Sequence, residues 1–120
     1  MPTRFLNARP HLEVADVERS ISFYERAFGF HVLHSMGEPP VHAIIEKDGV
    51  TVTLARVDSP AVASIAACFI DVEGVDELFA HCAAAGFKVA SEPTDRPWGI
   101  RDLVVVDPDG HLIAFGERID

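Results

Sequence analysis

One succession of secondary-structure signals occurs twice in this chain, and this repetition limits the possible folds more than any other feature. Each copy predicts a short strand, an amphipathic helix and three further strands. Three pairs of landmarks align at offsets of 58, 57 and 61 residues: Val14 with Val72, Gly29 with Gly86, and Asp48-Gly49 with Asp109-Gly110. The chain is therefore predicted to be a single domain, residues 1–120, built from βαβββ modules at about residues 5–57 and 66–118.

The helices are predicted from the spacing of their apolar residues. In the first module the apolar stripe is Val17, Ile21, Tyr24 and Phe28, with Asp16 as the expected N-cap and Gly29 as the end. In the second module it is Val75, Leu78, Phe79, Cys82 and Ala83, followed by Gly86 as the left-handed cap.

The strands are predicted from short apolar runs between turn signals. They are expected at 9–14, 30–33, 41–46 and 50–57 in the first module, and at 66–72, 87–90, 100–106 and 111–117 in the second. Asp48-Gly49 predicts a tight hairpin turn. Residues 35–40 and 91–99 are expected to be loops, and residues 57–65 a linker.

Charge and composition exclude several function classes. The chain has 10 Lys and Arg against 19 Asp and Glu, a net charge of -9, which disfavours nucleic acid as a partner. No apolar run is long enough to span a bilayer, so no membrane partner is expected. Asn7, Arg9, Pro10 and His11 interrupt any secretory signal, which predicts a cytoplasmic protein.

Two common kinds of reactive site are not predicted. Cys68 lies in a strand-like run and Cys82 on the second helix, without the close pairing of a redox or zinc motif, so both are expected to be buried thiols. There is no Gly-x-Ser-x-Gly elbow. Asp107 and Asp109 lie in a turn, where carboxylates most simply bond nearby backbone amides, and we interpret them as structural.

Two motifs in order carry a family resemblance: Val14-Ala15-Asp16-Val17-Glu18-Arg19-Ser20-Ile21-Ser22-Phe23-Tyr24 and Asp107-Pro108-Asp109-Gly110-His111-Leu112-Ile113. With the doubled βαβββ plan, they resemble the glyoxalase, bleomycin resistance and extradiol dioxygenase superfamily, also called the vicinal oxygen chelate superfamily. The resemblance implies an α+β fold in which two modules form a curled mixed sheet around a cleft. The segment Pro97-Trp98-Gly99-Ile100-Arg101-Asp102 looks most like the bleomycin resistance branch, which implies a homodimer holding a small ligand in clefts at its interface.

The metal enzymes of this superfamily imply four ligand positions, which here hold Arg9, Thr53, Ala67 and Ala114. Alanine supplies no lone pair and arginine repels a cation, so no cofactor is expected. A displaced divalent site stays open as an alternative: a shift of two residues keeps the strand face and brings in His11. His42, with His31 or His34 and Glu46, could also contribute.

The candidate ligand-binding residues are polar or aromatic side chains on strands or loops expected at the cleft. Trp98, between Pro97 and Gly99, can present its indole to a ligand, and only one of Arg101 and Asp102 can enter the cleft. The full predicted set is Arg9, His11, His42, Thr53, Phe69, Trp98 and Arg101.

We interpret the chain as a protein that binds a small cationic or aromatic molecule, an antibiotic being one candidate, without altering it. A metal-dependent glyoxalase-like lyase, isomerase or dioxygenase that uses His11, His42 and Glu46 is the alternative hypothesis. A metal-free enzyme with one of these histidines as general acid or base is a third.

Overall fold

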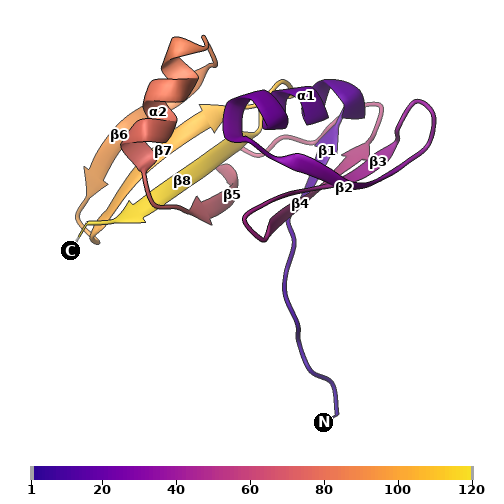
Figure 1. The fold of residues 1–120 in the computed structure, drawn as a ribbon, viewed down its shortest axis with the longest axis horizontal. Coiled ribbons are helices and arrows are strands. Elements are labelled where there is room, and N and C mark those ends of the chain that lie inside the picture. Colours follow the sequence, from indigo (N-terminus) through magenta and orange to yellow (C-terminus); the bar gives the residue numbers. More distant parts are fainter. Residues whose placement is uncertain (1, 120) are drawn as a thin grey trace.

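The structure is a computed structural model that describes residues 2–119, and Figure 1 shows two βαβββ modules in succession. The first comprises β1 (His11–Val14), α1 (Val17–Phe28), β2 (His31–Met36), β3 (His42–Lys47) and β4 (Val50–Arg56). The second comprises β5 (Ala66–Asp71), α2 (Val75–Ala84), β6 (Val89–Arg96), β7 (Ile100–Val106) and β8 (Leu112–Arg118). The predicted element order is confirmed in both modules.

Each module forms its own four-stranded mixed sheet. The strand orders are β1-β4-β3-β2 and β5-β8-β7-β6, so the two sheets have the same topology. β1 pairs with β4 and β5 with β8 in parallel, whereas the other neighbours are antiparallel. The helix returns the chain between the first and second strands of each module, and two antiparallel turns then reverse it twice, so the first and last strands are parallel.

The helices begin and end where the sequence predicts. The Asp16 side chain accepts a hydrogen bond from the Arg19 backbone N–H at 3.1 Å, and Gly29 ends α1 with a φ of 82°. α2 lacks such an N-cap, because Gly74 occupies that position, and left-handed Gly86 follows its last turn. The Asp48-Gly49 turn between β3 and β4 has positive φ at both residues, as the favoured two-residue hairpin turn requires.

A single apolar core joins the two modules on the side of the sheets that the helices cover. Two aromatic contacts cross between the modules: Phe23 meets Phe87 at a ring-centroid distance of 5.4 Å, and Phe28 meets Phe115 at 4.7 Å. α1 and α2 also touch, through the Cys82 thiol on the Ala27 carbonyl. Each module thus completes its core with the other, as expected for a repeat that cannot close a core alone.

The turn from β7 to β8 is a second link between the modules. Asp107 accepts backbone N–H bonds from Asp109 and His111, which confirms the predicted local role. The same turn also reaches the first module, because Asp107 accepts from the Tyr24 hydroxyl and Asp109 accepts from the Arg19 guanidinium. The prediction of a purely local turn is therefore too narrow.

Two strands continue well past the ends that the sequence predicts, whereas the other strand boundaries differ by at most two residues. Residues 91–96 belong to β6, although the polar run and Pro93 indicate a loop. β6 is an edge strand with two register shifts, where a proline costs no ladder hydrogen bond and polar side chains meet solvent. β2 likewise continues to Met36.

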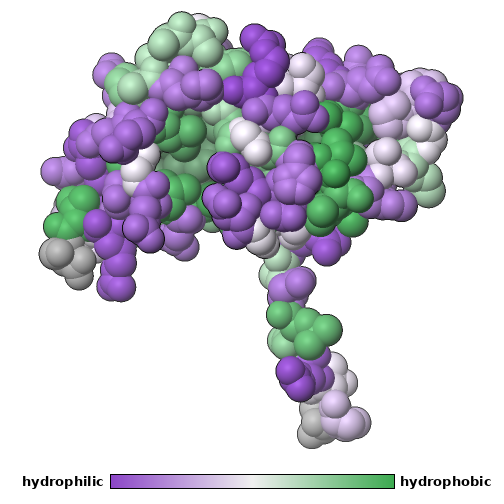
Figure 2. Space-filling view, viewed as in Figure 1, coloured by the Kyte–Doolittle hydropathy of each residue, from purple (hydrophilic) through white to green (hydrophobic). Residues whose placement is uncertain are grey.

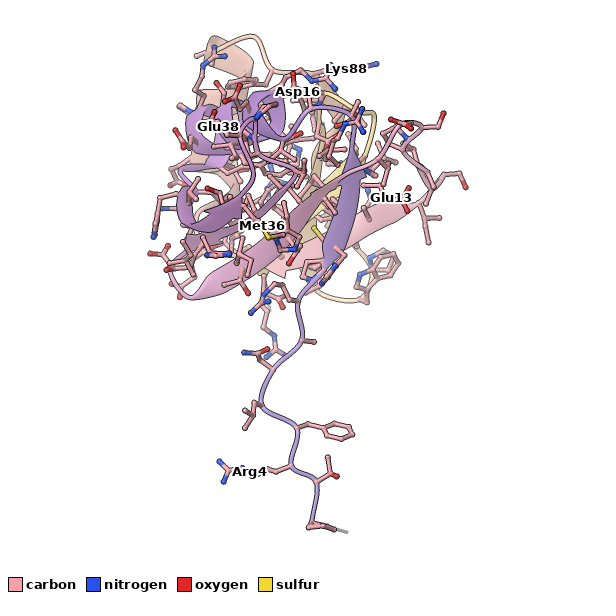
Figure 3. All side chains as sticks on the ribbon, turned by 90° about the vertical axis from the view of Figure 1, so that its right-hand side faces the viewer. Arg4, Glu13, Asp16, Met36, Glu38 and Lys88 are labelled. Carbon is pink, nitrogen blue, oxygen red and sulfur yellow. The ribbon has the colours of Figure 1, made fainter. Side chains whose placement is uncertain are left out.

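The segment before β1 is extended and leaves the body of the molecule, as Figures 1 and 3 show with Arg4 far from the two sheets. Phe5 and Leu6 are both more than 80% exposed there, at 85% and 81%. Among residues 2–119, the helices are all too short or too polar to cross a membrane.

Candidate functional site

Each sheet has one face that packs on the helices and one face that does not, and we call the latter its open face. Strand alternation assigns the side chains: Leu54 and Leu103 are fully buried on the helix side, so Thr53 and Asp102 belong to the open faces. The register then assigns their neighbours. The open faces are the surfaces that the predicted cleft requires.

The open face of the first sheet carries polar side chains, several of them imidazoles. His11 lies directly opposite Thr53 between β1 and β4, and His34 lies opposite Ile44 between β2 and β3. His42 is on the same face, opposite Ala55. The structure thus places three of the predicted site residues, His11, His42 and Thr53, on one face.

Thr53 is notable because its hydroxyl is buried without a partner. The residue is 1% exposed, and Oγ1 has no hydrogen-bond partner within residues 2–119. A buried hydroxyl without a partner costs free energy.

The donors of the alternative metal site are spread along the first sheet rather than gathered. His42 and Glu46 are four residues apart on β3, a span of about 13 Å at 3.3 Å per residue, whereas zinc ligands lie about 2 Å from one ion. Both Glu46 oxygens have partners, since Oε1 accepts from the Gly49 N–H and Oε2 lies 3.5 Å from His31 Nε2. Within residues 2–119, no group of three or more His, Cys, Asp or Glu side chains could hold a metal ion.

The four positions implied by the metal enzymes also do not fit a metal ion. Arg9 precedes β1, and its Nε donates to Thr51 Oγ1 at 3.2 Å. Ala67 and Ala114 offer methyl groups only, which leaves the Thr53 hydroxyl as the sole oxygen donor of the set.

The open face of the second sheet carries an aromatic platform. Phe69, in β5, is 49% exposed, and its ring lies over Gly116 in β8. A Cβ atom on Gly116 would overlap the Phe69 ring and lie 2.9 Å from Ile100 Cγ2. The missing side chain at Gly116 therefore makes the seat in which the ring rests, flat against the sheet and half open to solvent.

An ion pair that is partly shielded from solvent lies beside this platform. Asp102, in β7, is directly opposite Gly116 in the register, and its Oδ1 accepts from Arg96 Nε at 3.0 Å. Asp102 is nearly buried and Arg96 partly so. A carboxylate next to an aromatic face is an arrangement that can hold an organic cation.

The remaining predicted residues lie elsewhere. Arg101 is on the helix side of β7, where it bonds Asp76 of α2 at 3.0 Å and Asp95 at 2.9 Å, and these bonds raise its pKa. Trp98 lies in the turn between β6 and β7, 71% exposed, at the Ile100 end of the second open face. Asp102, not Arg101, is thus the open-face member of that pair, and Gly116 and Arg96 join it unpredicted.

Neither cysteine is poised as a nucleophile. Burial raises the pKa of the Cys68 thiol to about 11, and the nearby Asp107 carboxylate adds to the effect. Burial also raises the pKa of Cys82. Both are free thiols, Cys82 buried and Cys68 half-buried, and a raised pKa keeps them protonated at neutral pH.

Comparison with known proteins agrees with this architecture. A bleomycin resistance protein of Geobacillus stearothermophilus is 32% identical over 130 residues, covering 95% of this chain and 98% of that protein. The crystal structure of TioX from Micromonospora sp. ML1 is 28% identical, covers 96% of this chain and all of TioX, and superposes with a TM-score of 0.79. The bleomycin resistance determinant encoded on transposon Tn5 is 20% identical, covers 95% of this chain and 98% of that one, and shares the fold with a TM-score of 0.80.

The family model that matches the chain spans residues 8–115, which is nearly the whole of both modules. By that match, and by its identity to bleomycin resistance proteins over their full length, the chain belongs to the Glyoxalase/Bleomycin resistance protein/Dioxygenase superfamily.

Proposed function

We propose that this protein sequesters a small cationic or aromatic molecule of the bleomycin type in a cleft between open faces, without metal chemistry. The observation that carries the proposal is the Phe69 ring seated on Gly116 beside the Asp102 carboxylate, in a chain 32% identical to a bleomycin resistance protein. An aromatic platform and a carboxylate bind a flat or cationic group by stacking and charge.

The cleft needs a second chain in this proposal. Within one chain the shared core occupies the helix side of both sheets, so each open face lacks a cover from its own module. In a two-fold dimer, the first open face of one chain can oppose the second open face of its partner. The ligand would then lie between the imidazoles and Thr53 on one side and Phe69 with Asp102 on the other.

The charge of the chain supports a cationic ligand. With a net charge of -9, the protein attracts a cation over a longer range than a single carboxylate could, and salt would weaken that attraction. The Arg96 guanidinium balances the charge of Asp102 but donates to Oδ1, which leaves Oδ2 to accept a hydrogen bond from a ligand cation.

The test is calorimetric titration of the purified protein with metal-free bleomycin, with EDTA present throughout. Saturable binding that survives the chelator is expected, and Phe69→Ala should weaken it about two- to tenfold. The matched control is Phe79→Ala, which removes a ring from the helix side of the same module. The proposal fails if bleomycin does not bind, or if Phe69→Ala leaves its affinity unchanged.

A separate measurement addresses the assembly. Light scattering should give a mass of two chains at micromolar concentration, and bleomycin should bind with one ligand for each of two clefts. A monomer that binds ligand with full affinity would contradict the dimer cleft. Turnover of a small substrate by a sample loaded with zinc, nickel or ferrous iron would favour the lyase or dioxygenase alternative.

A further inference from the structure

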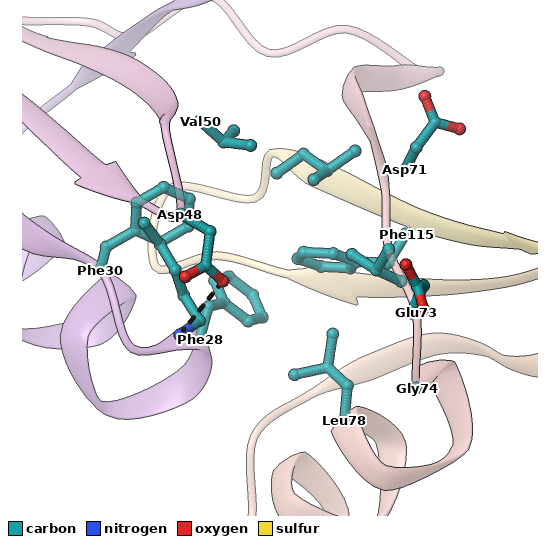
Figure 4. A pocket seen from close by; sticks show the side chains of 12 residues that line it. Phe28, Phe30, Asp48, Val50, Asp71, Glu73, Gly74, Leu78 and Phe115 are labelled. Atoms are coloured by element: carbon teal, nitrogen blue, oxygen red, sulfur yellow. Dashed lines mark ion pairs between the residues drawn. The ribbon is translucent and has the colours of Figure 1, made fainter.

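A second pocket lies on the helix side of the molecule, where the two modules meet, and we call it the junction groove. It has a volume of about 410 Å³. The β3–β4 turn bounds it on one side, and the end of β5 with the start of α2 bounds it on the other, as Figure 4 shows. Figure 2 shows apolar surface at the bottom of the depression between the modules. The floor of the groove belongs to the shared core and not to either open face.

The floor of the junction groove is a rigid aromatic surface. Phe28 contacts Phe115 at a centroid distance of 4.7 Å and Phe30 at 6.5 Å. All three rings are less than one-tenth exposed, so their neighbours in the core fix their positions. Val50 and Leu78 extend the apolar lining on opposite sides of the groove. Such a surface is preformed, which lowers the cost of binding an apolar group.

The rim of the junction groove is acidic. Asp48 stands on the hairpin turn, and Asp71 and Glu73 stand on the connection from β5 to α2. The lining has one cation, Lys47, whose Nζ lies 3.7 Å from Asp48. Neither Asp71 nor Glu73 forms an ion pair with another residue in the range 2–119. Three carboxylates against one ammonium group leave the rim negative.

The N-terminus of α2 does not reverse the preference of the acidic rim for a cation. A helix N-terminus attracts anions, and Gly74 and Val75 lie at this end of the groove. The Val75 N–H, however, already donates to Glu117 Oε1 at 3.1 Å. An anionic ligand would also have to approach Asp71 and Glu73, whose full charges exceed the partial charge of the helix end. A cation meets no such repulsion.

We propose that the junction groove binds a small organic cation that carries an apolar or aromatic group. The apolar group would rest on the phenylalanine floor, and the ammonium group would lie between Asp48 and Glu73, which stand on opposite sides of the groove in Figure 4. Aromatic rings attract cations at their faces, so floor and rim favour the same class of ligand. This site goes beyond the cleft function and does not depend on it.

The experiment titrates the full chain with benzyltrimethylammonium, and with phenylacetate and benzyl alcohol as anionic and neutral probes of similar size. Calorimetry should detect binding of the ammonium probe and not of the other two probes. Its affinity should fall as salt is raised from about 20 to about 200 mM, because ions screen the attraction between exposed charges. Equal binding of phenylacetate would overturn the proposal, because the acidic rim would then have no role.

Variants place the probe in the groove. Glu73→Gln and Asp48→Asn should each weaken the ammonium probe about two- to fivefold, the range of an exposed ion pair. Glu92→Gln, which removes an exposed carboxylate from β6, is the matched control and should leave the affinity unchanged. Val50→Trp should block the mouth, and circular dichroism would confirm that it folds. Unchanged affinity in both rim variants would refute the site.

Further variants distinguish binding in the junction groove from binding in the cleft. Phe69→Ala should leave the ammonium probe unaffected, and Glu73→Gln should leave bleomycin binding unaffected, so the two proposals fail independently. Loss of probe binding in Phe69→Ala would assign the probe to the cleft instead. Deletion of residues 2–6 should not change the affinity. A gain in affinity would mean that the N-terminal segment, and not a small cation, is the ordinary occupant of the groove, which would also overturn the proposal.

Discussion

The Tyr24 hydroxyl donates a hydrogen bond of 2.8 Å to Asp107 Oδ2, and this bond joins the helix of the first module to the β7–β8 turn of the second. Both groups are buried, and Asp107 uses its other oxygen for the backbone of its own turn. Burial, followed by the Asp107 charge, raises the pKa of Tyr24 and keeps the hydroxyl a donor. A single carboxylate thus closes its turn and holds the two modules together.

Replacing Tyr24 with Phe should destabilise the protein by about 1–3 kcal/mol, because a buried carboxylate oxygen loses its donor while the ring stays. Urea unfolding followed by circular dichroism would measure the loss. Thr94→Val is the control, since it removes an exposed hydroxyl that bonds only the nearby Glu92 carbonyl, and it should cost less than about 0.5 kcal/mol. Equal losses in the two variants would contradict the role given to Asp107.

Alkaline pH should destabilise the protein through Cys68. Its pKa rises from the ordinary 9.0 to about 11 in the folded state, so the folded chain holds a proton that the unfolded chain releases. Stability is therefore complete below about pH 9 and falls as the pH rises toward 11. In Cys68→Ala, the free energy of unfolding should fall by roughly 1–2 kcal/mol less over this pH range than in the unchanged protein. The difference is smaller than the whole pKa shift would give, because the thiol is only half-buried.

The measurement is urea unfolding of both proteins at pH 8, 9.5 and 11. Parallel curves for the two proteins would show that Cys68 does not contribute. Cys82→Ala is a poor control because it also opens the core; Ser91→Ala, at a hydroxyl near the surface, is the better one. A residual decline above about pH 9 in Cys68→Ala is expected from Cys82 and Tyr24, whose pKa values are also raised.

The elements that the sequence predicts best are those fixed by short-range chemistry. Asp16 caps α1, Gly29 ends it, and Asp48-Gly49 forms the turn between β3 and β4, because each requires only the few residues around it. Residues 91–96 of β6 are missed because the stability of that part of the strand comes from pairing with β7, which overrides the turn signals of Pro93 and its polar neighbours. The residues of a strand do not by themselves indicate which other strand it pairs with.

The candidate site is predicted less completely for a related reason. Alternation along β7 requires that Arg101 and Asp102 face opposite sides, but only the position of α2 shows which face is open. The seat of Phe69 depends on Gly116, 47 residues away, and no pattern in either strand indicates that contact. The hydrogen bonds that Asp109 accepts from the Arg19 guanidinium and the Ala15 N–H cross between the modules in the same way.

Replacing Gly116 with Ala should weaken ligand binding as much as removing the Phe69 ring. A methyl group at this position would overlap the ring and displace it from the sheet. Bleomycin affinity should fall about two- to tenfold in Gly116→Ala, and no further in the double variant with Phe69→Ala, because both changes remove the same platform. Additive losses in the double variant would mean that Gly116 acts on the ligand by another route.

Replacing Thr53 with Val should separate stability from binding. The Thr53 hydroxyl is buried without a partner within residues 2–119, so an apolar group of the same shape should stabilise the free protein by about 1 kcal/mol. If the ligand uses this hydroxyl from the first open face, bleomycin affinity should fall in the same variant, about three- to tenfold. Urea unfolding and calorimetry give the two values. Thr51→Val is the control, since that hydroxyl already accepts from Arg9 Nε. A variant that is more stable and binds with full affinity would place the ligand away from Thr53, and a variant that is less stable would show that a water satisfies the hydroxyl in the free protein.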